Sequence, residues 1–299
     1  VYLVRATIAV PFGPDSSMVS AAKTAMLGRA DLVVGVSHYV AGYVREWSGI
    51  DAIHVPISLL EPVKEYPLLG RFDNPYISMV NPCAVKGSSI FLELAERMPQ
   101  ARFAAIPTWG TQPGELAAMQ RQPNITLMDR MDNIDGLLKQ TRVMLVPSIW
   151  AEARSRVVLE AMSRGVPVLA SDVGGLHEAK LGVPYLVRVN PIVKYLPSVD
   201  SSMVPVAEVP KQDVTPWQRI LERLITDKSH WEALAADSRR AALAYAANLN
   251  ALPFEAALEA TLRKPKRQAS TTPKVGLSED KRRLLALRLK QRATSARPE

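Results

Sequence analysis

The sequence predicts an α/β fold made of two Rossmann-like domains with parallel sheets. Short apolar runs rich in β-branched residues alternate with helical patterns along most of the 299 residues. A proline-dotted segment interrupts this alternation once, and the alternation then resumes. Strands that alternate with helices form parallel sheets, because each helix carries the chain back to the starting edge of the sheet. The hydrophobic fraction of 47% is typical of a globular protein, and the length suffices for two domains.

The first domain is predicted over residues 1–58. Its opening run has Arg5 in the middle and no cleavage-site pattern, which indicates a strand and not a signal peptide. Ser37 directly follows a buried apolar run and is placed to cap the next helix. The expected elements are strands over residues 1–10, 30–37 and 52–58 and a helix over residues 38–47.

A hinge is predicted over residues 59–75, where three prolines and a glycine occur without a clear period. A second series of strands and helices follows, and with closing helices it forms the C-terminal domain over residues 76–262. Residues 190–216 are proline-dotted and aperiodic, and Thr215 is placed to cap the first closing helix, with Pro216 as its first residue. The expected strands lie at residues 76–81, 101–106, 124–128, 142–148, 166–171 and 184–189, and the expected helices between them at residues 88–98, 114–120, 134–140 and 155–164.

The net charge of +8 belongs to the C-terminal tail. Residues 263–299 contain 12 Lys and Arg against 3 Asp and Glu, which leaves 25 basic and 26 acidic residues in the first 262. The body of the protein is therefore nearly neutral, and the basic balance says little about what it binds. The tail is expected to form a basic linker and then an amphipathic helix over residues 277–293, a candidate for docking to a protein. Generic attraction to nucleic acid or acidic membranes is the alternative, and no specific nucleic-acid partner is expected.

Several kinds of site are not expected. The single cysteine, Cys83, excludes an intramolecular disulfide framework and a Cys-rich zinc site, and it suits a reducing cytosol, so a cytoplasmic location is expected. No apolar run approaches the roughly 20 residues of a membrane span. No group of His, Cys and Asp residues has metal-ligand spacing, so neither a metal nor a cofactor is expected. Of the four histidines, only His177, beside Gly174 and Gly175, is a candidate for ligand contact.

Glu152 and Glu160 stand eight residues apart, an interval that does not suit partners on one helix face. Glu152 lies in the loop at the carboxyl end of a predicted strand, the edge where open α/β sheets bind ligands. Ser155 can cap the helix that contains Glu160, and the free N–H groups at that helix start favour an anion such as a phosphate. Two carboxylates that flank a phosphate site suit a ligand with hydroxyls on both sides of a diphosphate, and a nucleotide-sugar is such a ligand.

The continuation of this motif resembles the retaining GT-B glycosyltransferases of family 4. After Glu152 come seven residues and then the pattern EAMxxGxPVxAxxxGGxxE, which ends at Glu178. The similarity extends over roughly residues 30–189, in which residues 30–49 resemble the last part of the family's N-terminal domain and residues 80–95 its loop with glycine and lysine. The resemblance implies a GT-B fold whose N-terminal domain is incomplete, because the family's domain is much longer than the part before the hinge. Much of the acceptor site is therefore expected to be absent.

The resemblance also implies roles for single residues. Glu152 would contact the donor sugar, Glu160 the ribose hydroxyls, and Lys86 would neutralise the diphosphate. Backbone groups around Ser155 and Arg156 would support the sugar and the phosphate. Glu152 and Lys86 are thus the expected catalytic residues. The residues expected to bind the donor are Asn81, Lys86, Gly87, Glu152, Arg154, Ser155, Arg156, Glu160, Gly174 and Gly175.

Two positions depart from the family's pattern. Asn81 stands where the family has an Arg, five residues before Lys86, so one phosphate-binding charge is missing. Arg154 and Ser155 stand where the family has Phe-Gly. Arg154 or Arg156 is expected to supply the lost positive charge.

The implied reaction moves a sugar, of hexose type, from a nucleotide-diphosphate donor to a hydroxyl acceptor with retention of configuration. Lys86 and a helix N-terminus can stabilise the leaving diphosphate without a metal. The expected acceptor is a natural product or a polysaccharide. The alternative is a catalytically degenerate nucleotide-binding or scaffolding module. A nucleotide-sugar epimerase is a weaker alternative, because the spacing of the two glutamates gives it no support.

Overall fold

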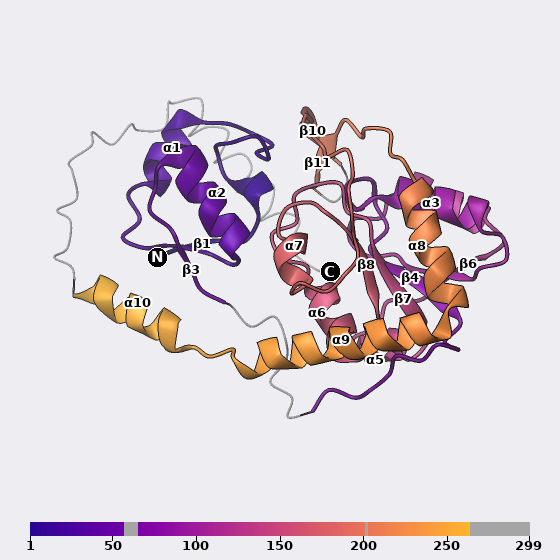
Figure 1. The fold of residues 1–299 in the computed structure, drawn as a ribbon. Helices are drawn as coiled ribbons and strands as arrows, with labels where there is room; N and C mark the ends of the chain where they lie inside the picture. The colour runs from indigo at the N-terminus through magenta and orange to yellow at the C-terminus, as the bar shows by residue number, and fades with distance from the viewer. Residues whose placement is uncertain (57–64, 201–202, 264–299) are drawn as a thin grey trace, which may run out of the picture. The chain divides into compact units, whose positions relative to one another are not determined.

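The chain divides into two compact units, Val1–Thr261 and Leu262–Glu299, and the sheets formed by the described residues lie in the first. No helix among the described residues is long and apolar enough to span a lipid bilayer. The computed structural model describes residues 1–56, 65–200 and 203–263 (Figure 1).

Three sequence-based expectations fall partly or wholly outside the described residues. They are the end of the strand expected over residues 52–58, the first part of the hinge at residues 59–64, and the basic tail from residue 264 onward, which includes the expected helix over residues 277–293. These parts stay predictions.

A three-stranded parallel sheet with the order β1-β2-β3 lies at the start of the chain. Its parallel strands are connected by helices, but the strand expected over residues 1–10 covers only Tyr2–Val4, and the helix over Ala21–Leu27 is not predicted from the sequence. Helix α2 begins where expected, because the Ser37 hydroxyl accepts a hydrogen bond from the Val40 N–H and so caps the helix. The elements are β1 (Tyr2–Val4), the 3-10 helix η1 (Thr7–Ala9), α1 (Ala21–Leu27), β2 (Val33–Gly35), α2 (His38–Ser48) and β3 (Ile53–His54).

A six-stranded parallel sheet with the order β6-β5-β4-β7-β8-β9 forms the centre of the larger part. The strand order reverses beside β4, because β5 pairs with one edge of β4 and β7 with the other. Such a reversal opens a crevice at the carboxyl ends of the strands. The strands are β4 (Tyr76–Val80), β5 (Phe103–Ile106), β6 (Ile125–Leu127), β7 (Thr141–Val146), β8 (Val168–Ser171) and β9 (Leu186–Val187).

Helices flank this sheet on both sides (Figure 1). The long helix α9 packs against both α6 and α8, which ties the closing helices to the sheet layers. The helices are η2 (Ala84–Lys86), α3 (Ser88–Arg97), α4 (Pro113–Gln120), α5 (Asp135–Leu138), α6 (Arg156–Ser163), α7 (Leu176–Ala179), α8 (Thr215–Thr226), α9 (Lys228–Ala247) and α10 (Leu252–Leu262).

The segment over residues 190–216 is not wholly irregular, and here the sequence-based expectation is wrong. It contains an antiparallel hairpin of β10 (Tyr195–Val199) and β11 (Pro205–Ala207). Pro197 lies inside β10 and most of the strand is exposed, so the run shows no hydrophobic alternation to reveal it.

Two expected helix caps differ from the structure. Ser155 is the N-cap residue of α6, but its side chain makes no capping hydrogen bond. Thr215 is the first residue of α8 instead of its cap, and Val214 occupies the N-cap position. The apolar period predicts that a helix is present. A capping hydrogen bond also requires the serine or threonine side chain to face the first turn of that helix.

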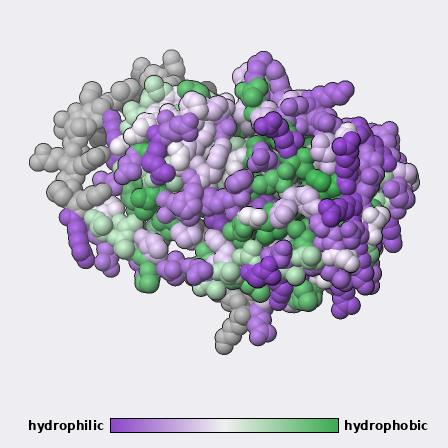
Figure 2. All heavy atoms as spheres, in the orientation of Figure 1, coloured by the Kyte–Doolittle hydropathy of each residue, from purple (hydrophilic) through white to green (hydrophobic). Residues whose placement is uncertain are grey.

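One large apolar core stabilises the six-stranded sheet and its helices. Phe91 and Phe103 are fully buried and meet edge to face, with ring centroids 5.6 Å apart. A second, smaller core lies in the three-stranded part around Val40 and Tyr43. The described surface is largely hydrophilic in the view of Figure 2, with hydrophobic groups showing between the purple regions.

Candidate functional site

Glu152 lies in the loop between β7 and α6, at the carboxyl end of a central strand, as predicted. Only 7% of the residue is exposed. Its Oε1 accepts hydrogen bonds from Lys86 Nζ at 2.5 Å and from the Ser148 hydroxyl at 2.6 Å. Burial alone would raise the pKa of Glu152, but the Lys86 ammonium and these hydrogen bonds outweigh it and hold the pKa below its usual range. Glu152 is therefore ionised at neutral pH.

Lys86 ends the 3-10 helix that follows β4, and Gly87 behind it turns the chain into α3. Gly87 has a φ of 81°, and a Cβ there would lie 2.0 Å from the Pro147 carbonyl oxygen, so only glycine fits. This close approach brings the loop after β4 against the loop after β7. The Lys86 ammonium lies 5.1 Å from the centroid of the Trp150 ring. Two loops from adjacent strands thus hold Lys86 beside Glu152.

Gly174 and Gly175 pack against the same glutamate loop. The Gly175 N–H donates to the Glu152 carbonyl oxygen at 2.6 Å. A Cβ on Gly174 would lie 2.7 Å from the Glu152 backbone, and one on Gly175 would lie 2.1 Å from the Ala153 carbonyl oxygen. The two glycines let the loop after β8 approach the loop after β7 closely, which fixes the backbone at Glu152.

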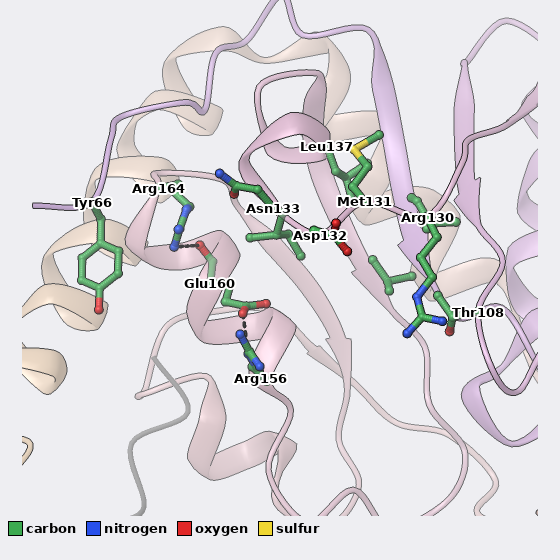
Figure 3. Close-up of a pocket in the computed structure, with 13 residues that line it drawn as sticks. Tyr66, Thr108, Arg130, Met131, Asp132, Asn133, Leu137, Arg156, Glu160 and Arg164 are labelled. Atoms are coloured by element: carbon green, nitrogen blue, oxygen red, sulfur yellow. Dashed lines mark hydrogen bonds and ion pairs between the residues drawn. The ribbon is translucent and has the colours of Figure 1, made fainter. Parts of the chain in front are cut away.

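Glu160 lies one turn into α6, and its side chain is 11% exposed. Arg156 Nε donates to Glu160 Oε1 at 2.5 Å, but the Arg156 side chain is 55% exposed. Both residues line a cavity of about 400 Å³ between α6 and the segment after β6 (Figure 3). This volume lies in the range of small-molecule sites. Glu160 thus faces a cavity, and its partner, the Arg156 guanidinium, is exposed to solvent.

The far wall of this cavity comes from residues that sequence reasoning did not select. Figure 3 shows Arg130, Met131 and Asp132 opposite Glu160, with Arg130 beside Thr108. These residues follow strands β5 and β6, so the carboxyl edge of the sheet predicts their region. Their sequence has no motif that distinguishes them from an ordinary polar loop.

Arg154 was expected as a substitute phosphate ligand, and the structure directs its side chain elsewhere. Its side chain is 2% exposed, and its Nη1 donates to Glu178 Oε1 at 3.3 Å. Its guanidinium carbon lies 4.5 Å from the centroid of the Tyr245 ring, a cation–π contact. The exposed Arg156 is the better placed of the two arginines. A donor contact by Arg154 stays a prediction.

Asn81 directly follows β4 and is 6% exposed. It has a φ of 57°, which an asparagine tolerates better than most residues. Its Oδ1 accepts a hydrogen bond from the Gly110 N–H at 3.0 Å. The residue therefore ties the loop after β5 to the loop after β4, and a direct donor contact stays a prediction. Trp109 beside Gly110 is 52% exposed.

The four histidines lie in different settings. His177 is 79% exposed in its side chain and lies 3.6 Å from Asp172. His230 hydrogen-bonds the Tyr185 hydroxyl at 2.6 Å. His38 and His54 lie together near Glu178, a grouping that their sequence separation does not reveal.

Residues 75–194 match the family model described as glycosyl transferases group 1. The matched region contains Lys86, Glu152, Glu160 and the Gly174-Gly175 loop. A comparison with curated protein sequences found no match.

Solved structures of glycosyltransferases are similar in fold. Sucrose-phosphate synthase from Thermosynechococcus elongatus is 19% identical, with 87% of this chain and 63% of that chain covered and a TM-score of 0.60. Anabaena Alr3699/HepE in complex with UDP and glucose is 14% identical, with 88% and 71% covered and a TM-score of 0.60. WaaG, a glycosyltransferase involved in lipopolysaccharide biosynthesis, is 15% identical, with 75% and 61% covered and a TM-score of 0.55.

The chain spans 63% of the length of the sucrose-phosphate synthase chain and 61% of that of WaaG. At these identities the likeness concerns the fold. The protein thus has the α/β fold with parallel sheets that GT-B glycosyltransferases share, and its residues 75–194 are similar to glycosyl transferases group 1.

Proposed function

We propose that this protein is a retaining glycosyltransferase that moves a hexose from a nucleotide-diphosphate donor to a hydroxyl acceptor. One observation carries the proposal. Within the region matched by the family model, Glu152 is buried and paired with the partly exposed Lys86, and Glu160 on the helix that follows lines a cavity. This arrangement supplies a separate carboxylate for each end of a nucleotide-sugar.

In this proposal, the cavity beside Glu160 receives the nucleoside. The Glu160 carboxylate accepts hydrogen bonds and suits the two hydroxyls of a ribose. Its partner Arg156 is largely exposed, so it can turn toward a phosphate without leaving a buried charge unpaired. Anabaena HepE, which has this fold, is described as bound to UDP and glucose, and this supports a nucleotide-sugar as the ligand.

Lys86 and Glu152 neutralise each other when no donor is bound. A diphosphate that approaches Lys86 competes with Glu152 for the ammonium and offers it more charge. Glu152 then keeps its hydrogen bond from Ser148 and turns its other acceptor sites to the hydroxyls of the donor sugar. After this exchange, Lys86 contacts the leaving diphosphate and Glu152 contacts the donor sugar.

During transfer, the bond between the anomeric carbon and the phosphate oxygen breaks. The electron pair leaves with the nucleoside diphosphate, and Lys86 stabilises the charge that develops there. The acceptor oxygen forms the new bond to the anomeric carbon on the face that the phosphate left, and its proton passes to the departing diphosphate oxygen. Lys86 supplies positive charge at the diphosphate, so this step uses no metal ion there.

The test is donor turnover by the full chain across a panel of nucleotide-sugars that differ in base and sugar. Water serves as the acceptor, so release of the nucleoside diphosphate can be measured without knowledge of the natural acceptor. We expect one donor class to be hydrolysed above the uncatalysed rate, and Lys86→Met to abolish that activity. Glu93→Gln serves as a control outside the site, because Glu93 pairs with Arg97 on α3. Nucleotide binding without turnover of any donor would contradict the transfer reaction and leave a binding module.

A further inference from the structure

Two histidines and a glutamate meet at a place that the proposed transfer does not use. His38 is the first residue of α2, His54 ends β3, and Glu178 lies in α7. His54 Nδ1 lies 2.9 Å from His38 Nε2, and His54 Nε2 lies 4.0 Å from Glu178 Oε1. One ligand atom from each residue can be chosen so that all three lie within 4.8 Å of one another.

Strand pairing and hydrogen bonds hold these residues in position. Gly35 on β2 pairs with His54 on β3. His38 follows Gly35 by three residues, so the pairing brings the two histidines close. The Ser37 hydroxyl, fully buried, donates to the Ala153 carbonyl oxygen at 2.7 Å. The Tyr39 N–H lies 3.3 Å from Glu178 Oε2 and donates to it. The start of α2 is thus bound to the part of the chain that carries Glu178.

The donor set suits a borderline metal ion. Imidazole nitrogen and carboxylate oxygen bind Zn²⁺ at about 2.0–2.2 Å, and three protein ligands with a water complete a tetrahedral site. In a tetrahedral site with these bond lengths two ligand atoms lie about 3.3–3.6 Å apart, so side chains in the cluster must move closer by at most about 1.5 Å. His54 Nε2 is buried and has no hydrogen-bond partner among the described residues.

We propose that His38, His54 and Glu178 bind a divalent transition-metal ion of the Zn²⁺ type, with a water as the fourth ligand. The ion links helix α2 and strand β3 to helix α7. None of the three ligands is a residue to which the proposed transfer assigns a role.

One nearby charge opposes the ion. The Arg154 guanidinium also contacts Glu178, so it competes with the metal for the carboxylate. Its stacking on Tyr245 keeps it in place when Glu178 turns toward the metal. We therefore expect an affinity weaker than that of closed structural zinc sites.

The experiment is titration of the untagged full chain with ZnCl₂ by calorimetry at pH 7.5, with Co²⁺ absorption as a second readout of tetrahedral coordination. The chain has four histidines and one cysteine, so few other sites of this kind exist. We expect one ion per chain, and a loss of affinity of at least about tenfold in His54→Ala and in Glu178→Gln. His177→Ala is the matched control and should bind as the wild type does, because His177 is 79% exposed and outside the cluster. Binding should weaken from pH 7.5 to 5.5, because protons compete for the imidazoles.

His38→Gln, at an exposed position, provides a second variant if His54→Ala fails to fold. The proposal is overturned if the wild type shows no saturable binding, or if folded His38→Gln and His54→Ala bind Zn²⁺ as tightly as the wild type. It is also overturned if His177→Ala loses as much affinity as they do. None of these outcomes depends on whether the protein transfers a sugar.

Discussion

The two carboxylates of the candidate donor site contact a cation at the same distance but in different surroundings. Glu152 and Glu160 each accept from a cation at 2.5 Å. The side chain of Lys86 is 21% exposed, whereas that of Arg156 is 55% exposed. Glu152 has a second donor in Ser148, while Glu160 faces a cavity. Glu152 is therefore held in a largely buried ion pair. Glu160 borders an open cavity, and its partner Arg156 is exposed to solvent.

The largest expected effect belongs to Glu152→Gln. In the proposed reaction this carboxylate orients the donor sugar, so we expect donor turnover to fall by about 10²–10³, the loss typical of one transition-state contact. Affinity for the free nucleoside diphosphate should not fall, because Lys86 and the cavity remain and the carboxylate that competes for the Lys86 ammonium is gone. Turnover assays and calorimetry on the same preparation measure both quantities. Equal losses of turnover and nucleotide affinity would contradict the division between the two ends.

Lys86→Met should lower the free energy of unfolding by about 3 kcal/mol, because it leaves the Glu152 carboxylate buried without its cation. The partial exposure of Lys86 places the effect at the lower end of the range for buried pairs. Urea unfolding measures it. The double variant Lys86→Met/Glu152→Gln should recover much of the loss. If the double variant is as unstable as Lys86→Met alone, the pair is not what destabilises the single variant.

Lys180 is a buried lysine with no carboxylate partner among the described residues, which distinguishes it from Lys86. It is fully buried, and its ammonium donates to the Val168 and Pro184 carbonyl oxygens at 2.5 and 2.7 Å. Burial lowers the pKa of Lys180 from 10.5 to about 7. Between these two pH values the unfolded chain binds one more proton than the folded chain, so the free energy of unfolding should rise with pH.

The rise due to Lys180 is at most about 1.4 kcal/mol per pH unit above pH 7. Lys180→Met should lack this contribution, so its stability curve should be flatter than that of the wild type from pH 7 to 9. Urea unfolding of both proteins at each pH gives the comparison. Parallel curves would show that Lys180 stays charged in the folded protein.

The smallest expected effect is that of Arg156→Ala on stability. The guanidinium is mostly exposed, so the free energy of unfolding should change by less than about 0.5 kcal/mol. Arg97→Ala is the matched control, because Arg97 pairs with Glu93 at the same helical spacing and the same 2.5 Å distance. A clearly larger loss of unfolding free energy for Arg156→Ala than for Arg97→Ala would mean that Arg156 and Glu160 also form a stabilising ion pair.

The sequence predicts the elements that local patterns control. Apolar periods indicate the parallel strands, and the position of Ser37 after an apolar run correctly predicts a helix cap. The placement of Glu152 at the carboxyl end of β7 also follows from the strand pattern. By contrast, the exposed hairpin at β10 and β11 has no apolar alternation and is not predicted.

The sequence does not predict the directions of side chains or their partners from distant parts of the chain. A motif position identifies Arg154 as a charged residue near the site, but only the fold shows that it faces Glu178 and Tyr245. In the same way, His38 and His54 have no metal-ligand spacing in sequence, and they meet Glu178 only through packing of distant elements. These contacts depend on tertiary structure, which a pattern of residue types does not specify.

The central claim is that Glu160 holds the nucleoside and Glu152 does not. The most direct test is calorimetric binding of the free nucleoside diphosphate that the wild type prefers, measured for Glu160→Ala, Glu152→Gln and the control Glu93→Ala. Loss of a buried acceptor costs about 1–3 kcal/mol, so Glu160→Ala should bind roughly 5–150 times more weakly. Glu93→Ala should bind within about twofold of the wild type, and Glu152→Gln should bind at least as tightly as the wild type. Unchanged affinity in a folded Glu160→Ala variant would contradict the claim.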